Sequence, residues 1–218
     1  MTAPGAIVFD LDGTLIDSRA DLGASINRLR GRHGLRPFSP EEVTARVGRG
    51  ARFLVERSLP EETSGSDIES SYRWFLADYA EHCTEATEPY PGVLDLLEEL
   101  GPRFPLALAT NKPGAMTHKI LAHLDLERFF AAVVAGDTLE VKKPNPRVLQ
   151  HLEGPLARKA SEFLLVGDSE VDAETAVAAG CRLALVSWGF GSEEDFGRFS
   201  PEILAHGAAD LAVSILGR

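Results

Sequence analysis

Cysteine is scarce in this chain of 218 residues, which holds only Cys83 and Cys181, far apart and each without a Cys-x-x-Cys partner. Two isolated thiols indicate neither a disulfide framework nor a thiolate zinc site, so we expect buried, reduced cysteines in a cytoplasmic protein. No apolar run approaches the roughly 20 residues that a transmembrane helix needs. The first six residues also lack the basic and long apolar regions of a signal peptide.

Basic residues are few as well. The 22 Lys and Arg residues face 33 Asp and Glu residues, which gives a formal net charge of −11. Nucleic-acid-binding proteins normally present a basic face, and anionic membranes attract basic segments. We therefore expect neither a nucleic acid nor a membrane as a partner. The length suits one domain with a smaller appendage, and the hydrophobic share of 44% is that of an ordinary globular protein.

Short apolar runs predict strands that are buried on both faces of a parallel sheet. They are Ala6–Phe9, Leu106–Ala109, Ala132–Ala135, Phe163–Val166 and Leu183–Val186. Helical patterns lie between most of them, at Pro91–Leu100, Gly114–Leu124 and Glu170–Ala179. Alternating strands and helices predict an α/β fold, a Rossmann-like parallel sheet with helices on both faces.

The first crossover differs from the others. Residues 17–88 contain no convincing buried strand, only helical patterns at Asp21–Arg32, Ala51–Leu59 and Ser70–His82. Such a stretch is too long for a loop inside a compact domain. We therefore expect residues 17–88 to form a small α-helical cap domain, inserted into a core domain of residues 1–16 and 89–218. Hinges are expected near residues 17–18 and 87–90.

Polar side chains follow the predicted strands, at the edge of the sheet where parallel α/β proteins bind ligands. They are Asp10 and Asp12 after the first strand, Thr110 and Asn111 after the second, Lys143 beyond the third, and Asp168 with Asp172 after the fourth. Taken singly, Asp12 could belong only to a turn and Asp168 only to a helix cap. Taken together, they predict a shared crevice.

Such a crevice suits phosphoryl transfer. Carboxylates as close together as Asp10, Asp12 and Asp168 repel one another unless a cation offsets their charge, and oxygen ligands of this kind suit Mg²⁺. Hydroxyl, amide and ammonium groups beside a metal suit a phosphoryl group. One carboxylate could act as the nucleophile, and a second, two residues further on, could protonate the leaving oxygen and then activate water.

Four segments resemble, in order, the four motifs of the haloacid dehalogenase superfamily in its phosphatase form. They are Phe9–Ser18 (FDLDGTLIDS), Thr110-Asn111, Lys143-Pro144 and Gly167–Asp172. The resemblance spans nearly the whole chain, and the insertion after the first motif falls where the superfamily has its helical cap. True dehalogenases in the superfamily lack a carboxylate at the position of Asp12, so its presence points to a phosphoric monoester hydrolase.

The resemblance also implies a role for each motif residue. Asp10 would be the nucleophile and Asp12 the general acid and base. Mg²⁺ would be held by Asp10, the backbone carbonyl of Asp12, and Asp168, with Asp172 behind the metal to orient its water or Lys143. The phosphoryl oxygens would be bound by Thr110, Asn111 and Lys143.

The cap carries an uneven charge. Residues 18–57 contain nine arginines, no lysine and four acidic residues. Arginine matches carboxylate or phosphate with a planar fork. Residues 47–57, together with Pro89–Val93 and Gly136–Leu139, resemble phosphoglycolate phosphatases, although Glu140 stands where many relatives have proline. The resemblance implies hydrolysis of 2-phosphoglycolate to glycolate and phosphate. Arg49 is singled out to reach the substrate carboxylate, whereas most other arginines are expected in a solvated, ion-paired helical face.

Several alternatives stay open. The substrate could be another small phosphate ester, such as a sugar phosphate or a nucleotide, or pyrophosphate, and the chain could be a catalytically silent binding module. A phosphomutase of this superfamily carries a histidine in the cap where this chain has Leu22. A phosphonatase needs a cap lysine, and no lysine precedes Lys112. The protein could be a monomer or a homodimer.

Overall fold

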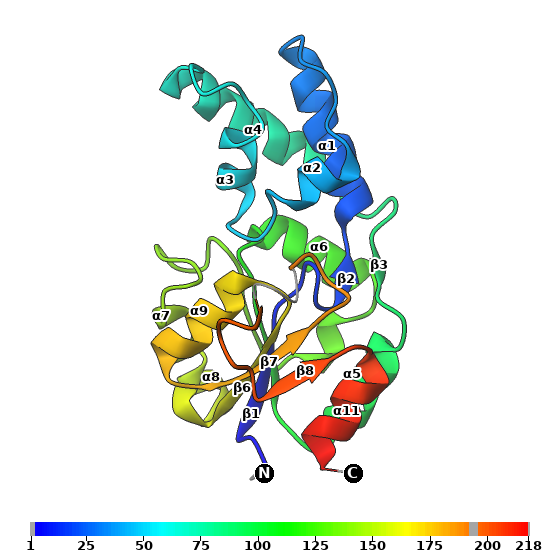
Figure 1. The fold of residues 1–218 in the computed structure, drawn as a ribbon, viewed down its shortest axis with the longest axis vertical. Coiled ribbons are helices and arrows are strands. Elements are labelled where there is room, and N and C mark those ends of the chain that lie inside the picture. The colour runs from blue at the N-terminus through cyan, green and yellow to red at the C-terminus, as the bar shows by residue number, and fades with distance from the viewer. Residues whose placement is uncertain (1–2, 192–195, 218) are drawn as a thin grey trace.

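The computed structural model describes residues 3–191 and 196–217 and contains a six-stranded, all-parallel sheet of order β5-β4-β1-β6-β7-β8 (Figure 1). Its strands are β1 (Ala6–Phe9), β4 (Leu106–Ala109), β5 (Ala132–Val134), β6 (Phe163–Gly167), β7 (Arg182–Val186) and β8 (Ile203–Ala205). The predicted α/β fold is confirmed, and the five predicted strands agree to within one residue at each end. Strand β8, at the edge, was not predicted.

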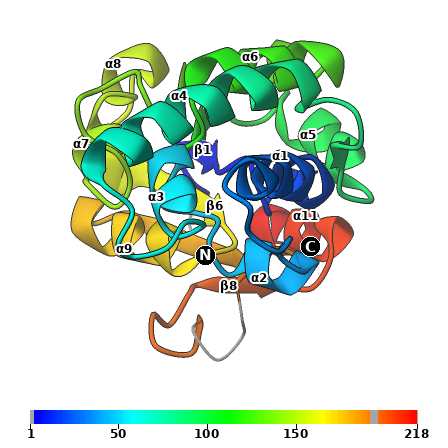
Figure 2. The same cartoon turned by 90° about the horizontal axis from the view of Figure 1, so that it is seen from above.

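Helices cover both faces of this sheet, because alternate residues of a strand point to opposite sides. Ile7 and Phe9 of β1 pack with one set of helices, and Ala6 and Val8 pack with another. The first set is α5 (Val93–Leu100), α6 (Gly114–His123) and α11 (Ala208–Leu216); the second is α7 (Arg147–Gln150), α8 (Glu153–Leu156) and α9 (Glu170–Ala179). Figure 2 shows the two sets on opposite sides of the strands. Two short 3₁₀ helices lie at Glu127–Phe129 and Ala160–Glu162.

Four further helices lie above the carboxyl ends of the strands (Figure 1). They are α1 (Arg19–Arg32), α2 (Pro40–Thr44), α3 (Ala51–Glu56) and α4 (Gly65–His82). Helix α4 begins five residues before the predicted Ser70, because the Ser64 side chain caps it by accepting a hydrogen bond from Asp67 N. Helix α2 was not predicted, although Ser39 and Glu42 form a capping box at its start.

A short antiparallel ribbon joins these upper helices to the sheet. Strand β2 (Ile16–Asp17) pairs with β3 (Glu88–Pro89), and the predicted hinge residues lie in or beside it. The buried carboxylate of Asp21 fastens the two connections to each other, since it accepts hydrogen bonds from the backbone N–H groups of Ala86 and Thr87 and from the Thr87 hydroxyl. None of the helices in the described part of the chain is both long and apolar enough for a membrane crossing.

Candidate active site

The central strands bring three predicted site residues to one edge of the sheet. Asp10 directly follows β1, Thr110 directly follows β4 and Asp168 directly follows β6. These three strands are neighbours in the sheet. All three side chains are buried. Their backbones continue the strand pairing, because Asp10 N donates to Val166 O at 2.8 Å and Thr110 N donates to Val134 O at 2.9 Å. The parallel topology therefore fixes the backbone positions from which these side chains extend.

Three carboxylates gather there. Asp10, Asp168 and Asp172 each place one oxygen within 4.8 Å of the others. Lys143 Nζ lies 2.8 Å from Asp10 Oδ1 and 2.6 Å from Asp172 Oδ1, and both lysine and carboxylates are buried. One ammonium thus faces three carboxyl groups, which leaves the cluster short of positive charge.

The pKa values report this shortage. Burial raises the pKa of Asp10 to about 7; Lys143 opposes the rise and Asp172 adds to it. Burial, with the nearby Asp172 and Asp10, also raises the pKa of Asp168 well above its ordinary value. Burial opposes the charge of Lys143, yet Asp10 and Asp172 hold the pKa of that lysine above its usual range. The site therefore favours an additional cation.

The donor set fits a divalent metal ion. Asp10 Oδ1 is buried and has no hydrogen-bond partner among the described residues, apart from the ion-pair contact with Lys143. Carboxylate and carbonyl oxygens are the ligands that Mg²⁺ prefers. Both carboxylate oxygens of Asp172 have partners, because Ser169 donates to Oδ2 from both N and Oγ while Lys143 contacts Oδ1. Asp10 is thus better placed than Asp172 to spare an oxygen for a metal.

Two glycines allow the Asp168 carboxylate to lie where it does. Gly13 has φ +88°, and a Cβ on it would lie 2.2 Å from Asp168 Oδ2. A Cβ on Gly189 would lie 2.4 Å from Asp168 Cβ and from the carbonyl oxygen of Gly13. Phe190 N donates to Asp168 Oδ2 at 2.7 Å, and Thr14 Oγ1 donates to Oδ1 at 3.2 Å. Sequence analysis missed Gly189 and Phe190, although the closely spaced glycines 189 and 191 could have indicated a tight approach.

Asp12 lies apart from this cluster and has partners of its own. Lys112 Nζ lies 2.8 Å from Asp12 Oδ1 and 3.1 Å from Oδ2, and Ser18 Oγ donates to Oδ1. The same ammonium donates to the Tyr79 hydroxyl at 2.7 Å. Burial opposes the charge of Lys112, but Asp12 and Tyr79 keep the pKa of the lysine above its usual value. Sequence analysis gave no role to Lys112 or Tyr79.

The Asn111 amide joins two segments. Its Nδ2 donates to Lys143 O and to Gly48 O, both at 3.0 Å, and its Oδ1 accepts from Lys143 N at 2.9 Å. The side chain is therefore committed to protein groups, and it links the end of β4 to the loop between α2 and α3. Thr110 Oγ1 accepts from Lys112 N at 3.2 Å, and its hydroxyl donates to no residue of the described part of the chain. The predicted phosphate-binding roles of these residues stay predictions.

A cavity of about 40 Å³ lies between the upper helices and the strand ends. The helices contribute a mostly apolar wall, and the strand ends contribute the polar groups. Its lining comprises Asp10, Asp12, Leu22, Val47, Gly48, Gly50, Ala51, Leu54, Phe75, Tyr79, Thr110, Asn111, Lys112 and Pro113. Among the described residues that line the cavity, only Lys112 has a cationic side chain.

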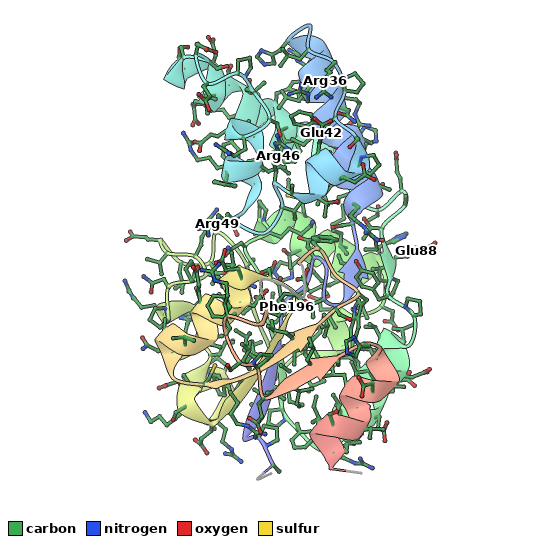
Figure 3. The ribbon with its side chains drawn as sticks, viewed as in Figure 1. Arg36, Glu42, Arg46, Arg49, Glu88 and Phe196 are labelled. Atoms are coloured by element: carbon green, nitrogen blue, oxygen red, sulfur yellow. The ribbon has the colours of Figure 1, made fainter. Side chains whose placement is uncertain are left out.

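Arg49 lies beside the cavity but does not line it. Its side chain is exposed on the loop between α2 and α3, and it makes no hydrogen bond or ion pair with a described residue (Figure 3). Its neighbours Gly48 and Gly50, with φ of +112° and +93°, do line the cavity. Most other arginines of residues 18–57 are engaged elsewhere. Four form ion pairs, such as Arg28–Asp78, Arg36–Glu42 and Arg52–Glu69, and Arg30 and Arg46 donate to backbone carbonyls.

A parallel sheet with buried carboxylates at its carboxyl edge, under a helical cover, is the arrangement of an α/β protein whose ligand site lies at the strand ends and is acidic. Residues 7–186 match the haloacid dehalogenase-like hydrolases, and the chain belongs to that family. The family resemblance predicted from the four motifs is confirmed, and so is the prediction of a hydrolase.

The most similar proteins include named enzymes. A phosphoglycolate phosphatase of Chromobacterium violaceum is 38% identical over 199 residues, which cover 88% of this chain and 89% of that protein. A phosphoglycolate phosphatase of Cereibacter sphaeroides is 39% identical over 191 residues, 86% of each chain. The crystal structure of a protein described as a predicted phosphoglycolate phosphatase from Haemophilus somnus has a TM-score of 0.90 and 30% identity, and the match covers 97% of each chain.

Proposed function

We propose that the protein is a Mg²⁺-dependent phosphatase that hydrolyses a small phosphate monoester, 2-phosphoglycolate, to glycolate and phosphate. The carboxylate of Asp10 carries the proposal. It is buried at the end of the central strand. Apart from the ion pair with Lys143 Nζ at 2.8 Å, its Oδ1 has no partner among the described residues. The names of the relatives support the choice of substrate.

In the proposed mechanism, Asp10 Oδ attacks phosphorus and the bond from phosphorus to the substrate oxygen breaks, which gives an aspartyl-phosphate. Asp12 gives a proton to the departing glycolate oxygen and then takes a proton from the water that cleaves the aspartyl-phosphate. The Thr110 hydroxyl, the Asn111 backbone N–H and the Lys143 ammonium bind the phosphoryl oxygens. Mg²⁺, held by Asp10, Asp168 and the Asp12 carbonyl, would offset negative charge on the phosphoryl group and the carboxylates.

Residues 17–88 act in this proposal as a mobile cap over the core of residues 1–16 and 89–218. The cavity lies between the upper helices and the strand ends, so both parts line it. Movement of the upper helices would therefore widen or narrow the entrance for a phosphate ester. The two connections at the β2–β3 ribbon suit such a hinge, and closure would keep bulk water away from the attack on phosphorus.

The test measures phosphate release from 2-phosphoglycolate and from p-nitrophenyl phosphate, with Mg²⁺ and with excess EDTA. We expect Mg²⁺-dependent release by the wild type and loss of more than about 10³-fold in Asp10→Asn, since the nucleophile is removed. Asp95→Asn makes the same chemical change on the exposed side of α5 and should leave activity unchanged. Full activity in Asp10→Asn, or none in the wild type, would contradict the mechanism.

A substrate panel tests the finer part of the proposal. It compares kcat/KM for 2-phosphoglycolate with that for glycerol phosphate, glucose 6-phosphate, a nucleoside monophosphate and pyrophosphate. We expect 2-phosphoglycolate to be preferred by at least about tenfold, which corresponds to about 1.4 kcal/mol of transition-state binding. A better substrate in the panel would overturn the choice of 2-phosphoglycolate and leave the phosphatase chemistry standing.

A further inference from the structure

Lys112 is a buried cation that the proposed phosphoryl chemistry does not use. Its side chain is 2% exposed, and a lysine so deeply buried needs partners that offset its charge. Those partners are the two oxygens of Asp12 and the hydroxyl of Tyr79. The phosphoryl group is served by a different lysine, Lys143, which contacts Asp10 and Asp172. Lys112 and Lys143 therefore have separate places in the site.

Tyr79 reaches Lys112 from the cap. It lies on α4, one turn before the end of the helix at His82, and its ring stacks on Phe75 with centroids 5.6 Å apart and planes 13° from parallel. Both rings are buried, which leaves the tyrosine little freedom to turn. Helix α4 runs beside α6 of the core (Figure 2). Lys112 lies just before the first residue of α6, Gly114. A continuous chain of contacts thus leads from the cap helix through Lys112 to Asp12.

We infer that Lys112 is a positioning residue for Asp12 and that Tyr79 holds Lys112 in place, so that proton transfer is aligned when α4 is docked on the core. The inference rests on the proposed role of Asp12 as the group that protonates the leaving oxygen. One ammonium in contact with both carboxylate oxygens restricts rotation of the carboxylate plane, and Ser18 restricts it further at Oδ1.

The leaving group distinguishes this role from a structural one. Glycolate leaves as a basic alkoxide and depends on a proton from Asp12, whereas p-nitrophenolate leaves readily without one. Lys112→Met should therefore lower kcat/KM for 2-phosphoglycolate by about 10²-fold, the loss expected when a catalytic group is displaced by about 1 Å. The kcat/KM for p-nitrophenyl phosphate should fall by less than about fivefold, because it reports only the steps up to release of p-nitrophenolate and not the later cleavage of the aspartyl-phosphate, which also uses Asp12.

Two further variants sharpen the experiment. Tyr79→Phe removes one hydroxyl and should lower kcat/KM for 2-phosphoglycolate by about tenfold with the same selectivity for the leaving group. Lys119→Met is the matched control, because Lys119 also links α6 to α4, donating to the carbonyls of Ala80 and Glu81, without touching Asp12. It should retain both activities within about twofold. If Lys112→Met does not fold, Tyr79→Phe carries the test alone.

A double variant shows whether Lys112 acts through Asp12. Asp12→Asn should lower kcat for 2-phosphoglycolate by about 10²- to 10⁴-fold, and adding Lys112→Met should cost nothing further. A multiplicative further loss would mean that Lys112 acts on the substrate directly, and the inference would be wrong. Equal losses of kcat/KM on both esters in Lys112→Met or Tyr79→Phe would also refute it. A wild type inactive on both esters would instead overturn the proposed function.

Discussion

The shortage of positive charge around Asp10 predicts that the metal-free protein loses stability as the pH rises from about 4 to 7. The pKa of Asp10 is about 7 in the folded protein and 3.8 in its ordinary environment. Between pH 4 and 7, the Asp10 carboxyl therefore keeps its proton in the folded state but has lost it in the unfolded state. Stability attributable to Asp10 is complete below pH 4 and is lost as the pH rises through 7.

The magnitude follows from the two pKa values. Each pKa unit corresponds to about 1.4 kcal/mol, so the rise from 3.8 to about 7 amounts to roughly 4 kcal/mol. Small domains have total stabilities of about 5–15 kcal/mol, so the effect is a large fraction of the whole. Mg²⁺ should restore most of it, because an ion bound to the carboxylates favours their ionised form and stabilises the folded state by an amount that grows with the logarithm of the Mg²⁺ concentration above its Kd.

The assay is urea unfolding between pH 4 and 8, in EDTA and in Mg²⁺, with Asp10→Asn as the reference that cannot ionise. The stability of the wild type in EDTA should fall relative to Asp10→Asn by about 4 kcal/mol across this range, and by much less in Mg²⁺. The pKa of Asp168 is also raised, by burial and by the nearby Asp172 and Asp10. The total loss of stability of the wild type across this pH range should therefore exceed the difference from Asp10→Asn. If the wild type and Asp10→Asn kept a constant difference in EDTA, the charge shortage inferred for the cluster would be wrong.

Three other outcomes are expected. Gly13→Ala should abolish Mg²⁺-dependent activity while the protein still folds, because its Cβ would lie 2.2 Å from Asp168 Oδ2; calorimetry with Mg²⁺ would show the lost binding. Asp21→Asn should lower the free energy of unfolding by about 1–3 kcal/mol in a urea titration, because the buried carboxylate accepts several hydrogen bonds. Arg49→Ala should raise KM for 2-phosphoglycolate by about tenfold but not KM for p-nitrophenyl phosphate, whereas Arg57→Ala, also exposed on the cap, should change neither.

Much of the fold was predictable from local patterns. Strands β1, β4 and β6 are buried on both faces, so they appear in the sequence as unbroken apolar runs such as Ala6–Phe9. Strand β8 has only three residues and exposes Leu204 at the edge of the sheet, and no such run marks it. The start of α4 was missed because hydrophobic periodicity gives its interior, while the Ser64 cap sets its true beginning.

The candidate site was predictable where the chemistry follows a strand directly. Asp10, Thr110 and Asp168 come immediately after neighbouring strands, so topology alone brings them together. Lys112 could not be given a partner from the sequence, because Asp12 lies 100 residues away and Tyr79 lies 33 residues away on a different helix. Such pairs depend on how the cap helices sit on the sheet, which local pattern does not determine.

The β2–β3 ribbon makes the chain leave the core and return to it at adjacent points. Asp17 pairs with Glu88 across the ribbon, so an insertion of any size between them disturbs no strand register of the sheet. Exchange of the inserted segment between these points leaves the strand order of the sheet intact, and with it the positions of Asp10, Thr110 and Asp168. The apolar side chains of Leu22 and Phe75, which join the same buried cluster as Phe9, limit that freedom. A replacement module must bring its own apolar underside.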